Sequence, residues 1–321
     1  MSVNAIGILT SGGDAPGMNA AVRAVVRAAL AKGIKVFGVY RGYNGLINDE
    51  IFEMNARTVS DIIHRGGTIL FTARSPEFKT EQGMSKAIAN CKKHGIEGIV
   101  VIGGDGSYRG ARDLSERGIP CVGLPGTIDN DISCTDYTIG FDTAMNTALE
   151  MIDRLRDTSQ SHERCSVCEV MGRNAGDIAL QVGIACGATF IVVPEVEFDY
   201  DRMINKIKQG QADGKKHFII VVAEGVGGVN ELARRIQEDT GIESRATILG
   251  HVQRGGNATL RDRVLASTMG HHAVELLSKG IGNRVVANVD NKITDFDIFE
   301  ALQMERKFDL ELYRISCELG M

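Results

Sequence analysis

The stretch VIGGDGSYRG, Val101–Gly110, places four glycines, one aspartate and one serine directly after branched apolar residues. A branched apolar run is typical of a buried parallel strand, and a glycine cluster behind it indicates a sharp turn or the close approach of a ligand. A helical pattern follows from Ser107 to Arg117, where Gly118 ends it. The stretch therefore predicts a strand, a ligand-binding loop and a helix in succession.

Similar apolar runs recur along the chain and alternate with amphipathic segments. The runs are AIGILT, KVFGVY, PCVGLPG, CSVCEVMG, ATFIVVPE, HFIIVVAEG and ATILGH. Several are apolar throughout, as expected of parallel strands covered on both faces. Further helices are expected at Gly17–Lys32, Asp142–Ser159, Asp177–Cys186 and Thr259–Lys279. The order predicts an α/β fold, and no Pro-rich linker or internal repeat is present.

The composition sets limits on function. The chain has 321 residues, of which 43% are hydrophobic, and a net charge of −5, which argues against nucleic acid as a partner. No apolar stretch reaches the length of a membrane span and the N-terminus lacks a signal-peptide pattern, so a cytoplasmic location without membrane contact is expected. Seven cysteines suggest reduced thiols, and Cys165 and Cys168 fall in an expected strand, where their side chains would face opposite sides.

Four polar or glycine-rich loops are expected at the carboxyl ends of strands, where open α/β sheets bind ligands. They are TSGGDAPGMN, GGDGSYRG, PGTIDND and MGRNAG. The first two suit phosphate binding at a helix N-terminus, although neither matches a Walker loop or the dinucleotide fingerprint. Asp105 between glycines is a candidate Mg²⁺ ligand, with a simple tight turn as the alternative. Asp129 and Asp131 beside Thr127 suit general-base chemistry, with an Asx-rich turn as the alternative.

Arginines near these loops indicate a second anionic substrate. Arg173 ends MGR, Arg164 ends SHER, and Arg245 and Arg254 flank His251 in SRATILGHVQRGG. The guanidinium fork matches phosphate geometry, although isolated arginines are usually surface charges. A magnesium aspartate, a candidate base and surplus arginines together predict phosphoryl transfer.

Taken together, these motifs resemble those of bacterial ATP-dependent 6-phosphofructokinases. TSGGDAPGMN, RGGT, GGDGS, PGTIDND, SHER, MGR, AEG and LGHVQRGG stand in that family's order over nearly the whole chain. The resemblance implies two doubly wound, mostly parallel α/β subdomains and transfer of the γ-phosphoryl group of ATP to the 1-hydroxyl of fructose 6-phosphate, the committed step of glycolysis. It places ATP in residues 1–139 plus 253–303, and the sugar in 140–252 plus 304–321.

The resemblance also implies roles for single residues. Asp129 would accept the proton, Thr127 and Asp131 would assist, Arg173 and Arg74 would neutralise charge, and Asp105 would hold Mg²⁺. The other ATP contacts would be Gly13, Tyr43, Ser75, Gly104, Gly106, Ser107 and Gly110. The sugar contacts would be Thr127, Ile128, Asp129, Met171, Gly172, Arg173, Glu224, His251, Val252, Gln253 and Arg254, joined by Arg164 and Arg245 from a neighbouring subunit of a homotetramer.

Regulation is where the chain departs from the family pattern. The effector set for ADP or phosphoenolpyruvate maps onto Arg23, Arg27, Arg156, Gly187, Lys215, Lys216 and His217. The pattern commonly has a glutamate for Mg²⁺ where Thr189 stands and a basic residue where Asp213 stands. Losing a carboxylate and adding a negative charge both weaken effector binding, so weak effectors are predicted unless neighbouring groups compensate.

Three other functions match the sequence less well. Pyrophosphate-dependent phosphofructokinases carry Asp where Gly106 stands and Lys where Gly126 stands, so the two glycines favour ATP. A dinucleotide-dependent oxidoreductase would need GxGxxG and an acidic residue after the second strand, KVFGVYRGY, which ends without one. A non-catalytic nucleotide sensor would give no reason for Asp129 beside Thr127 and Asp131.

Overall fold

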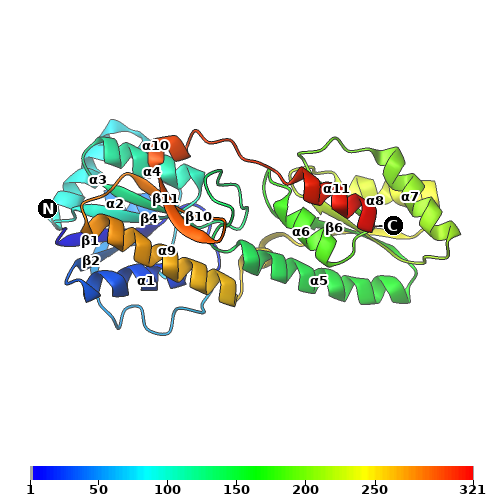
Figure 1. Cartoon of the computed structure of the whole chain (residues 1–321), viewed down its shortest axis with the longest axis horizontal. Coiled ribbons are helices and arrows are strands. Elements are labelled where there is room, and N and C mark those ends of the chain that lie inside the picture. The colour runs from blue at the N-terminus through cyan, green and yellow to red at the C-terminus, as the bar shows by residue number, and fades with distance from the viewer. Residues whose placement is uncertain (1–2, 321) are drawn as a thin grey trace. The chain divides into compact units, whose positions relative to one another are not determined.

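The computed structural model describes residues 3–320, and the chain forms two compact units (Figure 1). Unit 1 comprises Met1–Ile128, Ile132–Thr143 and Arg254–Arg306, and unit 2 comprises Asp129–Asp131, Ala144–Gln253 and Lys307–Met321. The boundaries expected from the sequence follow 139, 252 and 303, and the chain passes between the units after 128, 131, 143, 253 and 306. The assignment of ATP to one unit and the sugar to the other stays a prediction.

Unit 1 contains a seven-stranded sheet with the order β11-β10-β5-β4-β1-β2-β3. Its strands are β1 (Ala5–Thr10), β2 (Lys35–Val39), β3 (Ile51–Met54), β4 (Gly98–Gly103), β5 (Cys121–Pro125), β10 (Arg284–Val289) and β11 (Lys292–Asp297). The central strands pair in parallel, whereas β3 and β11 pair antiparallel at the two edges. Residues 290 and 291 both have positive φ in the tight turn between β10 and β11.

Helices cover both faces of this sheet (Figure 1). They are α1 (Met18–Ala31), α2 (Gly42–Ile47), α3 (Glu81–Lys93), α4 (Asp105–Glu116), α9 (Leu260–Ser278) and α10 (Ile298–Ala301), with a 3₁₀ turn at Glu77–Lys79. Helices α1 and α9 pack together so closely that a Cβ on Gly270 would lie 2.9 Å from the Cβ of Ala24. On the opposite face, Leu46, Met84 and Leu114 from α2, α3 and α4 share one buried apolar cluster with the sheet.

Unit 2 contains a four-stranded, fully parallel sheet with the order β7-β8-β6-β9. Its strands are β6 (Cys165–Val170), β7 (Phe190–Val192), β8 (Phe218–Ala223) and β9 (Ser244–Ile248). Its helices are α6 (Asp177–Ala185), α7 (Tyr200–Ala212), α8 (Val229–Thr240) and α11 (Leu310–Leu319), with a 3₁₀ turn at Gly250–Arg254. Helix α5 (Phe141–Ser161) begins in unit 1 and continues in unit 2.

The cysteines behave as packing residues. Cys165 and Cys168 are buried in β6, and only Cys165 belongs to the apolar cluster formed with α7 and α8, in agreement with opposite faces of the strand. Burial raises the pKa of each of these two thiols to about 12. Among residues 3–320, no group of three His, Cys, Asp or Glu side chains is arranged to hold a metal ion. No helix in that range has the length and hydropathy needed to cross a membrane.

Candidate active site

Three of the four expected loops meet at one edge of the unit 1 sheet, beyond the carboxyl ends of β1, β4 and β5. The Ser11 amide donates to the Ile102 carbonyl at 2.9 Å, and the Gly126 amide donates to the Gly103 carbonyl at 3.0 Å. A Cβ on Gly103 would lie 2.4 Å from the Ser11 carbonyl oxygen, so only glycine allows this approach. Backbone contacts therefore hold these three loops together.

Helix α4 begins at Asp105, directly behind Gly103 and Gly104. Its first amide groups and its positive end face the edge where the loops meet, which is the geometry that binds phosphate. The Asp105 carboxylate is about half exposed and contacts Arg109 at 3.0 Å. Mg²⁺ usually takes one or two carboxylates together with phosphate oxygens, so one exposed carboxylate beside a phosphate loop fits that ion.

The remaining expected ATP contacts divide into surface and core positions. Arg74 is exposed, and Gly106 has no atom within 4 Å of where a Cβ would stand. Tyr43 is buried instead: its ring stacks on Phe78 at 4.1 Å, and its hydroxyl donates to the Ser107 carbonyl at 2.5 Å. Burial raises the Tyr43 pKa well above its usual value. In this structure the Tyr43 side chain packs against the first turn of α4.

The segment between β3 and α3, which contains the RGGT motif at residues 65–68, forms hydrogen bonds with the loop after β1. Asn19 Nδ2 donates to the Arg65 and Gly66 carbonyls at 3.0 and 3.2 Å, and Thr72 Oγ1 donates to the Gly12 carbonyl at 2.7 Å. These bonds hold the stretch that leads to Arg74 and Ser75 against the β1 loop.

Arg254 occupies a position that its sequence did not reveal. Its guanidinium bonds the Asp14 carboxylate at 2.9 Å and the Asp14 carbonyl at 3.3 Å. A Cβ on Gly13 would stand 2.3 Å from Arg254 Nη2, so Gly13 leaves room for this arginine. Asp14 was not among the expected site residues, although a carboxylate inside TSGGDAPGMN was a signal for a cationic partner.

The fourth loop lies in unit 2, where charged side chains rather than backbone define the site. Arg173 follows β6, and its guanidinium lies 3.9 Å from the Asp129 carboxylate and 3.8 Å from the Asp131 carboxylate. Arg173 and Asn130 both adopt positive φ, at 54° and 52°. Such values are uncommon for non-glycine residues and are concentrated at functional sites.

Three strand ends in unit 2 contribute to this cluster. The Glu224 carboxylate after β8 accepts from the Arg173 amide, and the Gln253 side-chain oxygen after β9 accepts from the Met171 amide at 2.8 Å. Gln253 is fully buried, whereas its neighbours His251 and Val252 are exposed. The structure thus brings Asp129, Asp131, Met171, Gly172, Arg173, Glu224 and Gln253 together at one sheet edge.

Arg164 and Arg245 lie near the amino-terminal ends of the strands of the same sheet, opposite the Arg173 loop. Arg164 precedes β6, and Arg245 is in register with Ser166 near the beginning of that strand. Both guanidiniums bind the Glu243 carboxylate, at 2.8 and 2.7 Å. A strand as long as β6 spans roughly 20 Å at about 3.3 Å per residue, so these arginines are far from the Arg173 loop of their own chain.

The expected effector residues are also divided between the units. Arg156, Lys215 and His217 gather in unit 2, where burial first, and then Arg156 and Lys215, lower the His217 pKa. Arg156 donates to the Cys186 carbonyl next to Gly187, and Lys216 pairs with Glu163 at 2.6 Å. Arg23 and Arg27 lie on α1 in unit 1.

Comparisons with known proteins show which family the chain belongs to. The phosphofructokinase family model matches residues 5–277. The chain belongs to the phosphofructokinase family. It is 62% identical over 315 residues to an ATP-dependent 6-phosphofructokinase of Clostridium botulinum, covering 98% of this chain and 99% of that protein. The corresponding enzyme of Clostridium tetani is 60% identical with the same coverage.

Solved structures confirm the predicted phosphofructokinase-like α/β fold. Phosphofructokinase from Saccharomyces cerevisiae superposes with a TM-score of 0.90 at 35% identity, covering 99% of this chain and 48% of that longer one. A pyrophosphate-dependent phosphofructokinase from Marinobacter aquaeolei has a TM-score of 0.85 at 23% identity, over 96% of this chain and 86% of that one, and shows the fold alone. Family membership leaves no support for an oxidoreductase or a non-catalytic sensor.

Proposed function

We propose that the residues of the two sheet edges carry out phosphoryl transfer from ATP to a sugar phosphate, with ATP held in unit 1 and the sugar in unit 2. The chain is an ATP-dependent 6-phosphofructokinase, a kinase of glycolysis that forms fructose 1,6-bisphosphate and ADP. Identity to the clostridial enzymes supports the donor, as do Gly106 and Gly126, where the pyrophosphate-dependent enzymes carry charged side chains.

In unit 1, the loops after β1 and β4 would hold the ATP phosphates by backbone amides at the α4 N-terminus. Asp105 would hold Mg²⁺ with the nucleotide, exchanging its contact with Arg109 for the ion. Bound Mg²⁺ supplies charge neutralisation at the transferred phosphate. Exposed Arg74 would add a cation that can turn toward the same oxygens.

In unit 2, Asp129 would accept the proton of the sugar 1-hydroxyl. The observation that carries this assignment is Arg173, which lies within 4 Å of the Asp129 and Asp131 carboxylates. A nearby guanidinium keeps a carboxylate ionised and therefore able to accept a proton, and it can also neutralise charge that develops on the phosphoryl group. Met171, Glu224 and His251 would position the sugar, since they follow β6, β8 and β9, three strands that are adjacent in the sheet.

Replacement of the candidate base tests the assignment. Asp129→Asn keeps the shape of the side chain and removes the proton acceptor, so kcat should fall by ~10²–10⁴ while KM changes far less. Asp201→Asn removes a carboxylate from the exposed face of α7 and serves as the matched control, with kcat unchanged. Near-normal kcat in Asp129→Asn, measured by coupled ADP release, would assign the base elsewhere.

The proposal extends to assembly and regulation. Because Arg164 and Arg245 stand far from the Arg173 loop of their own chain, they would contact the sugar 6-phosphate of a neighbouring subunit in a homotetramer. ADP and phosphoenolpyruvate would act as weak effectors at Arg156, Lys215 and His217. A cytoplasmic location is part of the same proposal.

A further inference from the structure

Residues 135–140 of unit 1 run alongside the chain that leads from β5 to the candidate base. The Ile139 amide donates to the Pro125 carbonyl at 2.7 Å, and Ile139 forms a parallel β-bridge with Gly126. Thr127 and Ile128 come next in the chain, directly before Asp129. The 135–140 segment therefore supports the backbone that leads to Asp129.

Hydrogen bonds fix the 135–140 segment at both of its ends. At the first end, the Asn288 amide of β10 donates to the Thr135 hydroxyl at 2.9 Å, and the Asp136 amide donates to the Asn288 carbonyl at 2.8 Å. At the other end, the Gly140 amide donates to the buried Asp262 carboxylate of α9 at 2.9 Å. The segment is thereby anchored to the sheet and to a helix of unit 1.

Thr138, in the middle of this segment, connects it to Thr127 by its side chain. The Thr138 hydroxyl donates to the Thr127 carbonyl at 2.7 Å, and Thr138 is fully buried. A threonine hydroxyl has one O–H donor, and a buried donor requires a partner, so this donor is committed to the Thr127 carbonyl. Because the peptide group is planar, the bond fixes the orientation of the whole peptide between Thr127 and Ile128.

The orientation of that peptide matters because the chain beyond it is short. Residues 129–131 belong to unit 2, and the chain enters them from Ile128 and returns to unit 1 at Ile132. One residue spans at most about 3.6 Å, so a shift of the Thr127 peptide cannot be absorbed before Asp129. The shift is passed on to the Asp129 carboxylate, which lies 3.9 Å from the Arg173 guanidinium.

We propose that Thr138 is a positioning residue for phosphoryl transfer, whose hydroxyl holds the Thr127 peptide and thereby the Asp129 carboxylate. This role rests on the proposed function of Asp129 as the proton acceptor. A general base must lie within hydrogen-bond reach of the proton that it accepts, and a misplacement of about 1 Å can cost on the order of 10² in rate. Thr138 acts through the backbone, so the role requires no contact with ATP or with the sugar.

Three substitutions of Thr138 test the hydroxyl. Thr138→Val keeps the shape of the side chain and removes the O–H, so kcat should fall roughly 10- to 100-fold, while KM for either substrate changes less than about threefold. Thr138→Ser keeps the hydroxyl and should retain kcat within about threefold. If urea titration shows that Thr138→Val does not fold, Thr138→Ala is compared with Thr138→Ser, since these two differ only by the hydroxyl.

Thr240→Val is the matched control. Thr240 Oγ1 donates to the Ile236 carbonyl at 2.6 Å at the end of α8, so this variant loses the same kind of hydrogen bond in another part of the chain. Its kcat should be unchanged. Equal losses of kcat in Thr138→Ser and in the variants without a hydroxyl would assign the effect to packing of the methyl group and overturn the proposal.

The double variant with Asp129→Asn separates positioning of the base from other effects. If Thr138 acts through Asp129, the double variant should be no slower than Asp129→Asn alone, because a base that is absent cannot be misplaced. Losses that multiply would show that Thr138 acts elsewhere and overturn the proposal, as would normal kcat in Thr138→Val beside a low kcat in Asp129→Asn. Near-normal kcat in Asp129→Asn itself would refute the base assignment, and the role of Thr138 with it.

Discussion

The loops that follow the strands of unit 1 and unit 2 differ in the groups they offer to anions. In unit 1 the loops after β1, β4 and β5 hold one another by backbone hydrogen bonds, and Gly103 has no space for a side chain. In unit 2 the loop after β6 is defined by charged side chains, with Arg173 beside Asp129 and Asp131. The first edge should therefore be sensitive to added atoms, and the second to removed charges.

Gly106→Asp tests the effect of an added negative charge at the unit 1 loops. No atom lies within 4 Å of the position that a Cβ would take at Gly106, and an acidic residue in the first turn of α4 favours the helix dipole, so folding should be unharmed. The new carboxylate would face the ATP phosphates, and like charges in contact cost several kcal/mol, so kcat/KM for ATP should fall by roughly 10²–10³. Gly106→Ala, which adds a methyl group without charge, is the matched control.

The measurement is ADP release with ATP, run beside phosphate transfer with pyrophosphate. An unchanged kcat/KM for ATP in Gly106→Asp would show that the ATP phosphates do not bind beside this loop. At Gly126 the second difference from the pyrophosphate-dependent enzymes is less easily introduced, because a Cβ there would lie 2.9 Å from Ile102 Cγ2. We therefore expect packing as well as charge to maintain the preference for ATP.

Removed charges in unit 2 are tested by mixing two inactive variants. If Arg245 serves a neighbouring subunit, hybrids of Asp129→Asn and Arg245→Ala chains should regain activity, because some sites combine two intact halves. Random pairing gives roughly a quarter of the sites both groups, from the product of two equal probabilities. Recovery is measured after denaturation and refolding of a one-to-one mixture. Hybrids without recovery would mean that each chain completes its own pocket.

The sequence predicted the features that have a local sequence signal and missed those that depend on contacts between distant residues. Glycine loops after apolar strands identified the unit 1 edge, because glycine at a close approach has few substitutes. The pairing of Arg254 with Asp14 was not predicted, since it joins residues 240 positions apart. Tyr43 was expected at the nucleotide, and this contact stays a prediction; in the structure the Tyr43 ring is buried and its hydroxyl donates to the Ser107 carbonyl in α4.

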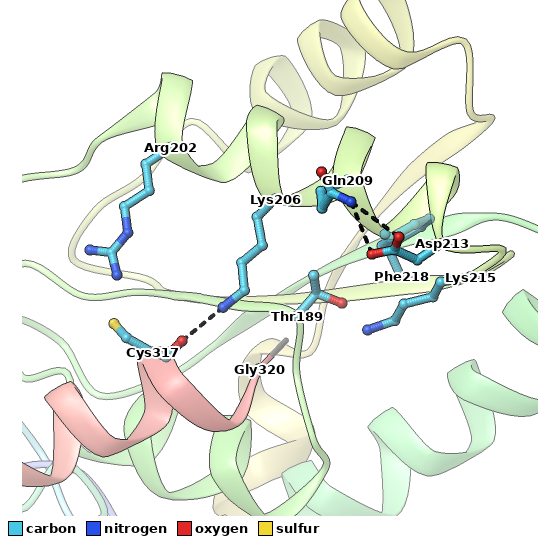
Figure 2. Close-up of a pocket in the computed structure, with 10 residues that line it drawn as sticks. Thr189, Arg202, Lys206, Gln209, Asp213, Lys215, Phe218, Cys317 and Gly320 are labelled. Atoms are coloured by element: carbon cyan, nitrogen blue, oxygen red, sulfur yellow. Dashed lines mark hydrogen bonds between the residues drawn. The ribbon is translucent and has the colours of Figure 1, made fainter.

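Other parts required the fold itself. The β10–β11 hairpin was not predicted, although the Asp290–Asn291 turn with positive φ at both residues is a local signal for one. The contact between Lys206 on α7 and the Cys317 carbonyl on α11 (Figure 2) was not predicted either, since it joins residues 111 positions apart. The Lys206–Cys317 contact and the Arg254–Asp14 pair were both missed because they join segments far apart in the sequence.

Asp262 differs from the other side chains described in unit 1, because its carboxyl group is fully buried. Its carboxylate accepts from the Gly140 amide at 2.9 Å, the Thr143 amide at 2.8 Å and the Thr143 hydroxyl at 2.6 Å. These bonds anchor the start of α5 just before the chain enters unit 2 at Ala144. Asp262→Asn leaves buried donors without acceptors and should lower the free energy of unfolding by about 1–3 kcal/mol.

The pH dependence of that loss has a definite sign. Burial raises the Asp262 pKa to about 6, so between about pH 4 and 6 the folded chain holds a proton that the unfolded chain has lost. Stability from this group is present below the unfolded pKa and is lost as the pH rises through about 6. The difference in unfolding free energy between the native chain and Asp262→Asn should therefore shrink from pH 4.5 to pH 7 in urea titrations. A constant difference would contradict the raised pKa.

The smallest expected effect concerns regulation in unit 2, at the two positions where the sequence departs from the expected effector pattern. Thr189 is buried and offers no carboxylate, and Asp213 is held by Gln209 near Lys215. An effector shifts an equilibrium only by its difference in affinity for two states, so millimolar phosphoenolpyruvate should change half-saturation by fructose 6-phosphate less than about threefold. The double variant Thr189→Glu with Asp213→Arg restores the family pattern and should enlarge the shift. A shift on the order of tenfold in the native chain, or ~1.4 kcal/mol of coupling, would show that neighbouring groups compensate and that the site works as it stands.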